Sequence, residues 1–133
     1  MIDKIFVPPS VHVATGMIVL ALSLLAALRV AWLTWRGAAL TRDAHGLLIG
    51  TQLALMLQAL IGIKLLDQGL GAAQLFIHYV GGLAPLFFFS LLYWLPLRQP
   101  RHKTRLAAAA TAGAFVFALM TFTIGQAYVR GTI

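Results

Sequence analysis

The sequence predicts an all-α integral membrane protein, a single domain of four transmembrane helices in an up-down-up-down bundle. Three observations predict this fold. Of 133 residues, 61% are hydrophobic and only 10% are charged, against roughly a quarter charged in an ordinary soluble domain. Four apolar runs are each long enough to cross about 30 Å of hydrocarbon. The connections between them are short, which makes neighbouring helices antiparallel.

The first two predicted spans cover residues 11–35 and 46–63. The first is interrupted only by Arg29, which lies near its end and can extend its guanidinium toward the interface. The second is continuously apolar and is followed by Lys64. Both are long enough to cross the hydrocarbon layer as helices.

The third and fourth predicted spans cover residues 70–97 and 106–129. In the third, Pro85 cannot donate a hydrogen bond to the carbonyl of Gly81, so we expect a bend there. The fourth opens with Ala107–Ala110, whose short side chains favour close packing between helices.

The distribution of basic residues predicts the orientation of the bundle. Seven of them lie at the first and third connections: Arg29, Arg36, Arg42, Arg98, Arg101, Lys103 and Arg105. The opposite side has only Lys4, Lys64 and Arg130. Cytoplasmic loops are enriched in Lys and Arg, so we expect both termini on the non-cytoplasmic side of the cell inner membrane.

Composition also excludes several classes of protein. The chain has no cysteine, which excludes a disulfide scaffold and metal sites built on thiolates. In a soluble protein the net charge of +7 would suggest a nucleic-acid partner. Here the basic residues follow membrane topology, so we expect the lipid bilayer and no nucleic acid. The only acidic residues are Asp3, Asp43 and Asp67, in the tail or the predicted loops, which argues against a proton-driven transporter.

Two histidines are the strongest candidates for chemistry. His12 begins the first span and His78 lies in the first half of the third, so both belong to the same side of an up-down bundle. Each has glycine one turn later: Gly16 follows His12, and Gly82, with its neighbour Gly81, follows His78. Imidazoles from two helices, each beside a small residue, suit axial ligation of a haem iron. The alternative is that these residues serve helix packing alone.

Further polar residues could assist such a site. Lys64 and Arg130 lie on the same side and could balance haem propionates, or act as simple interfacial anchors. Gln58 in the second span could contact the cofactor or cross-link helices. His45 and His102 belong to the cytoplasmic connections, where we expect them to be solvated; a second ligand site at His45 is the alternative.

Residues 55–95, "LMLQALIGIKLLDQGLGAAQLFIHYVGGLAPLFFFSLLYWL", resemble the haem A synthase family. In that family a Leu-Gln-x-x-x-Gly helix and a short outer loop precede a helix that carries a haem-ligand histidine. Residues 11–32, "VHVATGMIVLALSLLAALRVAW", are similar to the helix that carries the other histidine of the same four-helix half. The resemblance implies that His12 and His78 are the axial pair, with Gln58 and Gly62 on the intervening helix.

Members of this family usually have two such halves and oxidise a methyl group of haem O to give haem A. The family has Glu three residues before the first histidine and Arg directly after it, where this chain has Pro9 and Val13. The sequence therefore predicts a small b-type haem-binding protein for electron transfer or haem handling, and leaves enzymatic activity open. A homodimer would rebuild the eight-helix arrangement. The alternative is a cofactor-free accessory subunit of a respiratory or photosynthetic membrane complex.

Overall fold

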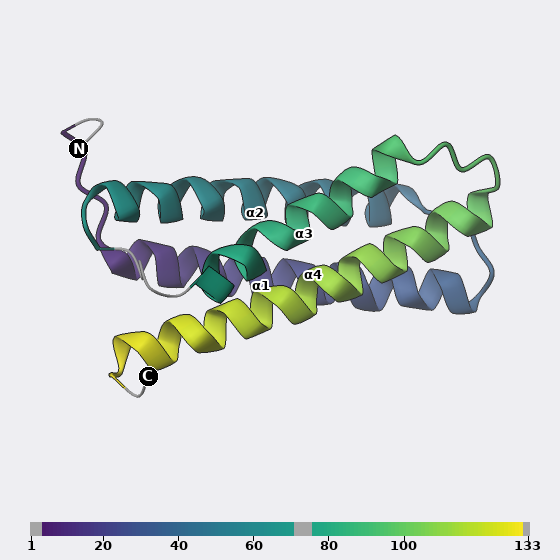
Figure 1. Ribbon diagram of the computed structural model, residues 1–133. Coiled ribbons are helices and arrows are strands. Elements are labelled where there is room, and N and C mark those ends of the chain that lie inside the picture. Colours follow the sequence, from purple (N-terminus) through teal and green to yellow (C-terminus); the bar gives the residue numbers. More distant parts are fainter. Residues whose placement is uncertain (1–3, 71–75, 132–133) are drawn as a thin grey trace.

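The computed structural model of this protein describes residues 4–70 and 76–131, which form four helices and no strand. The helices are α1 (Pro9–Trp35), α2 (Arg42–Asp67), α3 (Phe76–Trp94) and α4 (Pro100–Val129). They lie alongside one another, with the N- and C-termini at the same end (Figure 1). Helix α4 packs along both α1 and α3, whereas α2 packs mainly along α1. The predicted all-helical architecture is confirmed.

The helices extend beyond the apolar runs from which they were predicted. Helices α1 and α4 begin at Pro9 and Pro100 rather than at residues 11 and 106. Proline suits the first turn because its missing N–H has no intrahelical partner there. Helix α2 continues past the predicted 46–63 at both ends, through charged residues that lie outside the apolar run.

Helix α3 is shorter than the predicted span of residues 70–97. It ends at Trp94, because Pro96 restricts the residue before it and cannot donate to the helix. At the other end, Leu70 closes α2 instead of starting α3: its N–H donates to the carbonyl of Leu65 at 2.9 Å, after Gly69 with φ +73°. This is the usual glycine-containing end of a helix. Residues 71–75 of the predicted span lie outside the described residues.

Small side chains form much of the contact surface of α4. Its buried residues include a stripe at intervals of four, three and four, Ala107, Thr111, Ala114 and Ala118, with Ala110 beside it. The hydroxyl of Thr111 donates to the carbonyl of Ala107 at 2.8 Å, so it needs no partner outside its own helix. Small residues let membrane helices approach closely, which strengthens van der Waals packing.

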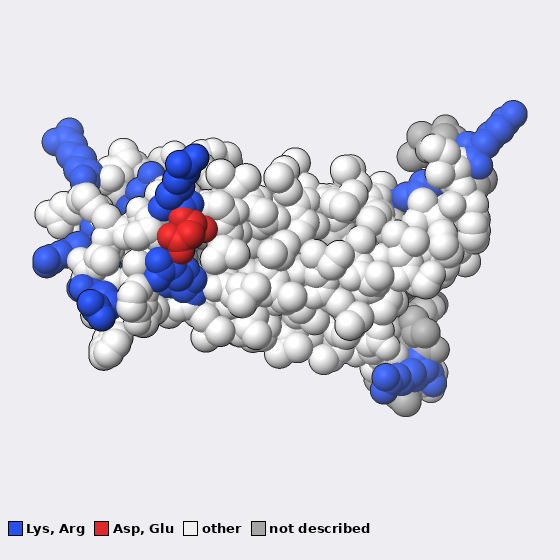
Figure 2. All heavy atoms as spheres, turned by 180° about the vertical axis from the view of Figure 1, so that it is seen from behind, with Lys and Arg blue, Asp and Glu red and all other residues white. Residues whose placement is uncertain are grey.

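Large apolar side chains face outward. Leu28 and Leu60, for example, are 62% and 63% exposed. Figure 2 shows basic side chains at the two ends of the molecule and none across the wide band between them. All four helices are long and apolar enough to cross a membrane. These features are those of a multi-pass membrane protein.

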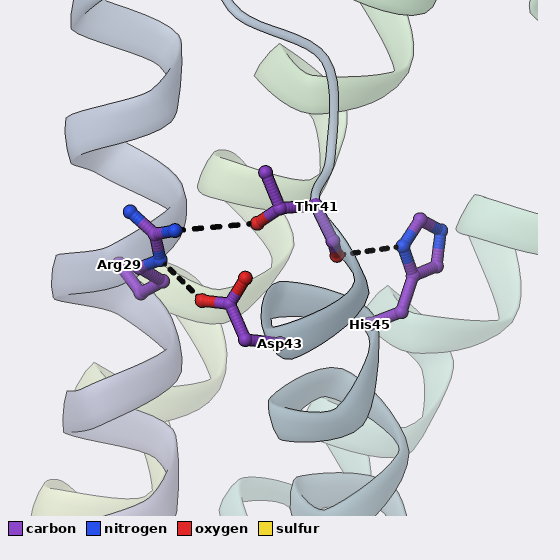
Figure 3. A network of polar contacts seen from close by, with 4 residues as sticks. All are labelled: Arg29, Thr41, Asp43 and His45. Atoms are coloured by element: carbon purple, nitrogen blue, oxygen red, sulfur yellow. Dashed lines mark hydrogen bonds and ion pairs between the residues drawn. The ribbon is translucent and has the colours of Figure 1, made fainter.

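The end opposite the termini contains a polar network (Figure 3). Nε of Arg29 donates to Oδ2 of Asp43 at 2.6 Å, and Nη2 of Arg29 donates to the hydroxyl of Thr41 at 3.4 Å. Nδ1 of His45 lies 3.0 Å from the carbonyl oxygen of Thr41. Arg29 therefore links α1 to the start of α2. The ring of His45 contacts the main chain of Thr41, directly before α2.

Candidate functional site

His12 and His78 lie side by side. Their ring centres are 6.3 Å apart and the ring planes are inclined by 58°. His12 is the fourth residue of α1 and His78 is the third residue of α3. Counted from the predicted start at Leu70, His78 would lie deeper than His12. Leu70 closes α2 and does not begin α3, so the depth of His78 is not counted from Leu70, and the ring contact brings the two histidines to one level.

Helix α4 orients the imidazole of His78. Nδ1 of His78 lies 3.1 Å from the carbonyl oxygen of Thr121. A carbonyl only accepts hydrogen bonds, so Nδ1 carries the ring proton and Nε2 keeps its lone pair. Behind the ring is Gly125, where a methyl group would lie 3.1 Å from Cε1 of His78. The absence of a side chain at Gly125 lets this imidazole lie against α4.

Gln58 of α2 holds His12 in a comparable way. Nε2 of Gln58 donates to the main-chain carbonyl of His12 at 3.1 Å and lies 3.3 Å from Nε2 of the ring. The hydroxyl of Thr15 donates to Oε1 of Gln58, which fixes the orientation of the amide. Because an amide nitrogen only donates, Nε2 of His12 is the ring nitrogen with the lone pair. Nδ1 of His12 is buried without a hydrogen-bond partner among the described residues.

The glycines beside the two imidazoles belong to other helices. A methyl group at Gly62 of α2 would lie 3.3 Å from Cε1 of His12. Gly62 therefore stands in the same relation to His12 as Gly125 does to His78.

Gly16, Gly81 and Gly82, which follow the histidines in sequence, pack against neighbouring helices instead. A methyl at Gly16 would meet Nε2 of Gln58 at 3.2 Å and Cδ2 of Phe122 at 3.3 Å. Gly81 and Gly82 face the side chain of Thr121. These three glycines therefore bring helices together, and the atoms nearest to a methyl group at each site are not those of the imidazoles.

The two predicted cations differ in their surroundings. Nζ of Lys64 pairs with Oδ2 of Asp67 at 3.1 Å, at the end of α2. Arg130 directly follows α4 and lines an open groove with four residues of that helix: Phe122, Thr123, Gln126 and Ala127. Arg130 is thus the cation at the edge of an accessible surface.

Two neighbouring imidazoles are enough to hold a haem iron from both sides. The described residues contain no group of three or more His, Cys, Asp or Glu that could hold a metal ion. Structural zinc usually takes four protein ligands and catalytic zinc three, whereas a haem iron needs one or two axial ones. With a metal–nitrogen bond of about 2.0 Å, and about 1.2 Å from each nitrogen to its ring centre, two imidazoles on one metal have ring centres roughly 6–6.5 Å apart. The His12–His78 separation matches this range, and a carbonyl partner such as that of Thr121 is typical of ligating histidines.

Sequence reasoning did not identify Thr121, Gly125 or Thr15. Thr121 acts on His78 through its main-chain carbonyl, which any residue would provide, so no side-chain pattern reveals it. Gly125 could have been noticed as a glycine near the end of the fourth span, at the level where an antiparallel neighbour carries His78.

Comparison of the chain with protein-family models, with curated proteins and with solved structures gave no match. The resemblance to haem A synthase therefore depends on the quoted residues alone.

Proposed function

We propose that this protein holds one haem b between His12 and His78, for electron transfer or haem handling. The 6.3 Å separation of the two ring centres carries the proposal, because it is close to the spacing of two imidazoles that share one iron. The contact of Nδ1 of His78 with the carbonyl of Thr121, which leaves the lone pair on Nε2 of that ring, supports it. The resemblance to one four-helix half of haem A synthase favours the same pair.

We infer an up-down-up-down arrangement in the cell inner membrane, with both termini on the non-cytoplasmic side. The termini lie at one end of the bundle (Figure 1). The connections at the other end carry most of the Lys and Arg residues, as cytoplasmic loops do. In this orientation the two histidines lie near the non-cytoplasmic surface.

Each surrounding residue has a physical role in this proposal. Thr121 orients the imidazole of His78 and Gln58 holds the main chain of His12, while Gly62 and Gly125 leave space for the rings against the helix backbones. Arg130 offers a positive charge at the same end, where haem propionates would be exposed. A bound haem would supply the redox chemistry. We do not extend the proposal to haem oxidation, because Pro9 replaces the glutamate of the haem A synthase pattern.

Absorption spectra of the protein in mild detergent, before and after dithionite, test the proposal. We expect a b-type α-band that disappears in both His12→Ala and His78→Ala. The matched controls are His45→Ala and His102→Ala, which remove histidines from the opposite end and should leave the band intact.

A band that survives either His12→Ala or His78→Ala would overturn the assignment of the ligands. A folded preparation that stays colourless after haem supplementation would instead favour the cofactor-free accessory subunit. Its partners would be other subunits of a respiratory or photosynthetic complex. Sedimentation of the purified protein would show whether two chains associate into an eight-helix dimer.

A further inference from the structure

A small polar cavity lies at the other end of the bundle, where the end of α1 meets the start of α4. Its volume is about 70 Å³. A single water needs roughly 10–15 Å³ of such space, so the cavity has room for a group of several atoms. It is lined by Thr34, Gly37, Ala38, Arg101, Thr104 and Arg105.

The two walls of this cavity meet at Thr34 and Thr104. The hydroxyl of Thr34 in α1 lies 3.4 Å from the carbonyl oxygen of Thr104 in α4 and donates to the carbonyl of Val30 at 2.9 Å. Gly37 has φ +63° and no heavy atom within 4 Å of the position that a methyl group would take. The wall at Gly37 therefore carries no side chain, and a ligand could approach from that side.

Arg101 and Arg105 give the cavity a concentrated positive charge. They are four residues apart and so lie on one face of α4. Among the described residues no carboxylate pairs with either of them, since Asp43 binds Arg29 and Asp67 binds Lys64. Like charges at this spacing repel each other.

The start of α4 adds to this charge. The first turn of α4 contains no acidic residue, and the residue before the helix makes no side-chain cap. The partial positive charge of the helix end therefore reinforces the two guanidiniums. An anion in the cavity would reduce the repulsion between Arg101 and Arg105, and it would also compensate the partial positive charge at the start of α4.

We propose that this cavity binds a phosphate group, held by the guanidiniums of Arg101 and Arg105. The planar fork of donors on arginine matches phosphate oxygens closely. The same chemistry is offered by the headgroup of an anionic phospholipid and by free phosphate. The exposed rings of Trp32 and Trp35, on the same part of α1, are 45% and 80% accessible and are typical of the membrane interface. The site thus lies at the level of lipid headgroups, and it is independent of the proposed haem site.

Native mass spectrometry in detergent, with phosphatidylglycerol added, tests this proposal. We expect the wild type to retain phosphatidylglycerol, and Arg101→Gln/Arg105→Gln to retain at least fivefold less. The matched control is Arg98→Gln/Lys103→Gln, which removes the same charge from the same segment but outside the cavity, and it should bind as the wild type does. Diacylglycerol with the same acyl chains, which lacks the phosphate, should be retained equally little by all three proteins.

A measurement with inorganic phosphate alone distinguishes free phosphate from a lipid headgroup as the ligand of this cavity. Stabilisation of the wild type against thermal unfolding by phosphate, absent in Arg101→Gln/Arg105→Gln, would identify a site for the free ion. Retention of phosphatidylglycerol without this effect would identify a lipid site. Equal retention by the wild type and the cavity variant, or equal loss in the cavity and control variants, would overturn the proposal. If the double variant fails to fold, Arg105→Gln alone, compared with Lys103→Gln, gives the same test.

Discussion

Gly125 of α4 lies directly behind the imidazole of His78, so that a methyl group on this glycine would be 3.1 Å from Cε1 of the ring. His12 has a similar relationship with Gly62 of α2, at 3.3 Å. Each candidate ligand is thus carried by one helix and supported by another. All four helices therefore contribute to the geometry of the pair.

The change Gly125→Ala should weaken haem binding, because the added methyl must displace the ring of His78. Overpacking of this kind costs about 1–3 kcal/mol, or roughly 5- to 150-fold in affinity. Titration of the haem-free protein with haem, followed in the Soret region, measures the effect. Gly50→Ala is the control, since a methyl there meets no atom within 4 Å. Equal affinities for the two variants would show that the ring does not depend on its contact with α4.

Replacement of Gln58 by Leu should increase the affinity for haem. The amide of Gln58 lies 3.3 Å from Nε2 of His12 and so would compete with iron for the lone pair of that nitrogen. A hydrogen bond has a net value of about 0.5–1.5 kcal/mol, which corresponds to roughly 2- to 12-fold.

The control for Gln58→Leu is Gln52→Leu on the same helix. Gln52 donates to the carbonyl of Leu48 and to the hydroxyl of Tyr93, at 3.2 and 2.8 Å. Its replacement should leave haem affinity unchanged. Weaker binding by Gln58→Leu would mean that Gln58 positions His12 more than it competes with iron.

The change Gln68→Ala should release the segment before α1. Oε1 of Gln68 accepts from the N–H of Val7 at 2.7 Å, and its Nε2 donates to the carbonyl of Val7 at 2.8 Å. Loss of both bonds, at about 1 kcal/mol each, should accelerate hydrogen exchange at the Val7 amide by roughly tenfold or more. Gln99→Ala is a suitable control, because Gln99 precedes α4 without capping it. Unchanged exchange at Val7 would show that other contacts hold this segment.

The orientation in the membrane can be read from single cysteines, since the chain has none of its own. In right-side-out membrane vesicles, a membrane-impermeant maleimide should label Lys4→Cys and not Gln99→Cys. Gln99→Cys should react only after the vesicles are opened. The reverse pattern would place both termini in the cytoplasm.

The number of helices was predictable because crossing the hydrocarbon layer requires long apolar runs, and these are visible in the sequence. The ends of the helices depend on different physics. Helices α1 and α4 begin at Pro9 and Pro100, before the apolar runs begin. Leu70 belongs to the turn that ends α2. Residues that end a helix are often polar or small, so hydropathy does not locate them.

The contacts of the candidate site were less predictable, because they depend on how each helix is rotated about its axis. In a soluble bundle an apolar stripe fixes this rotation. Here the helices are apolar on the outside as well as the inside, so the sequence says little about how each helix is rotated about its axis. The order of the helices was enough to put His12 and His78 at one end. It could not indicate that Gly16 faces Gln58 and Phe122, while Gly62 lies against His12.

Two adjacent residues of α4 lie between the helices that carry the imidazoles: Thr121 lies against Gly81 of α3 and Phe122 against Gly16 of α1. The thickness of α4 at this level therefore sets the gap between the rings, although neither ring belongs to it. If His12 and His78 hold a haem, that gap would decide whether both imidazoles can reach the same iron. The side chains at positions 121 and 122 would then tune the site, although neither belongs to the pair that holds the group.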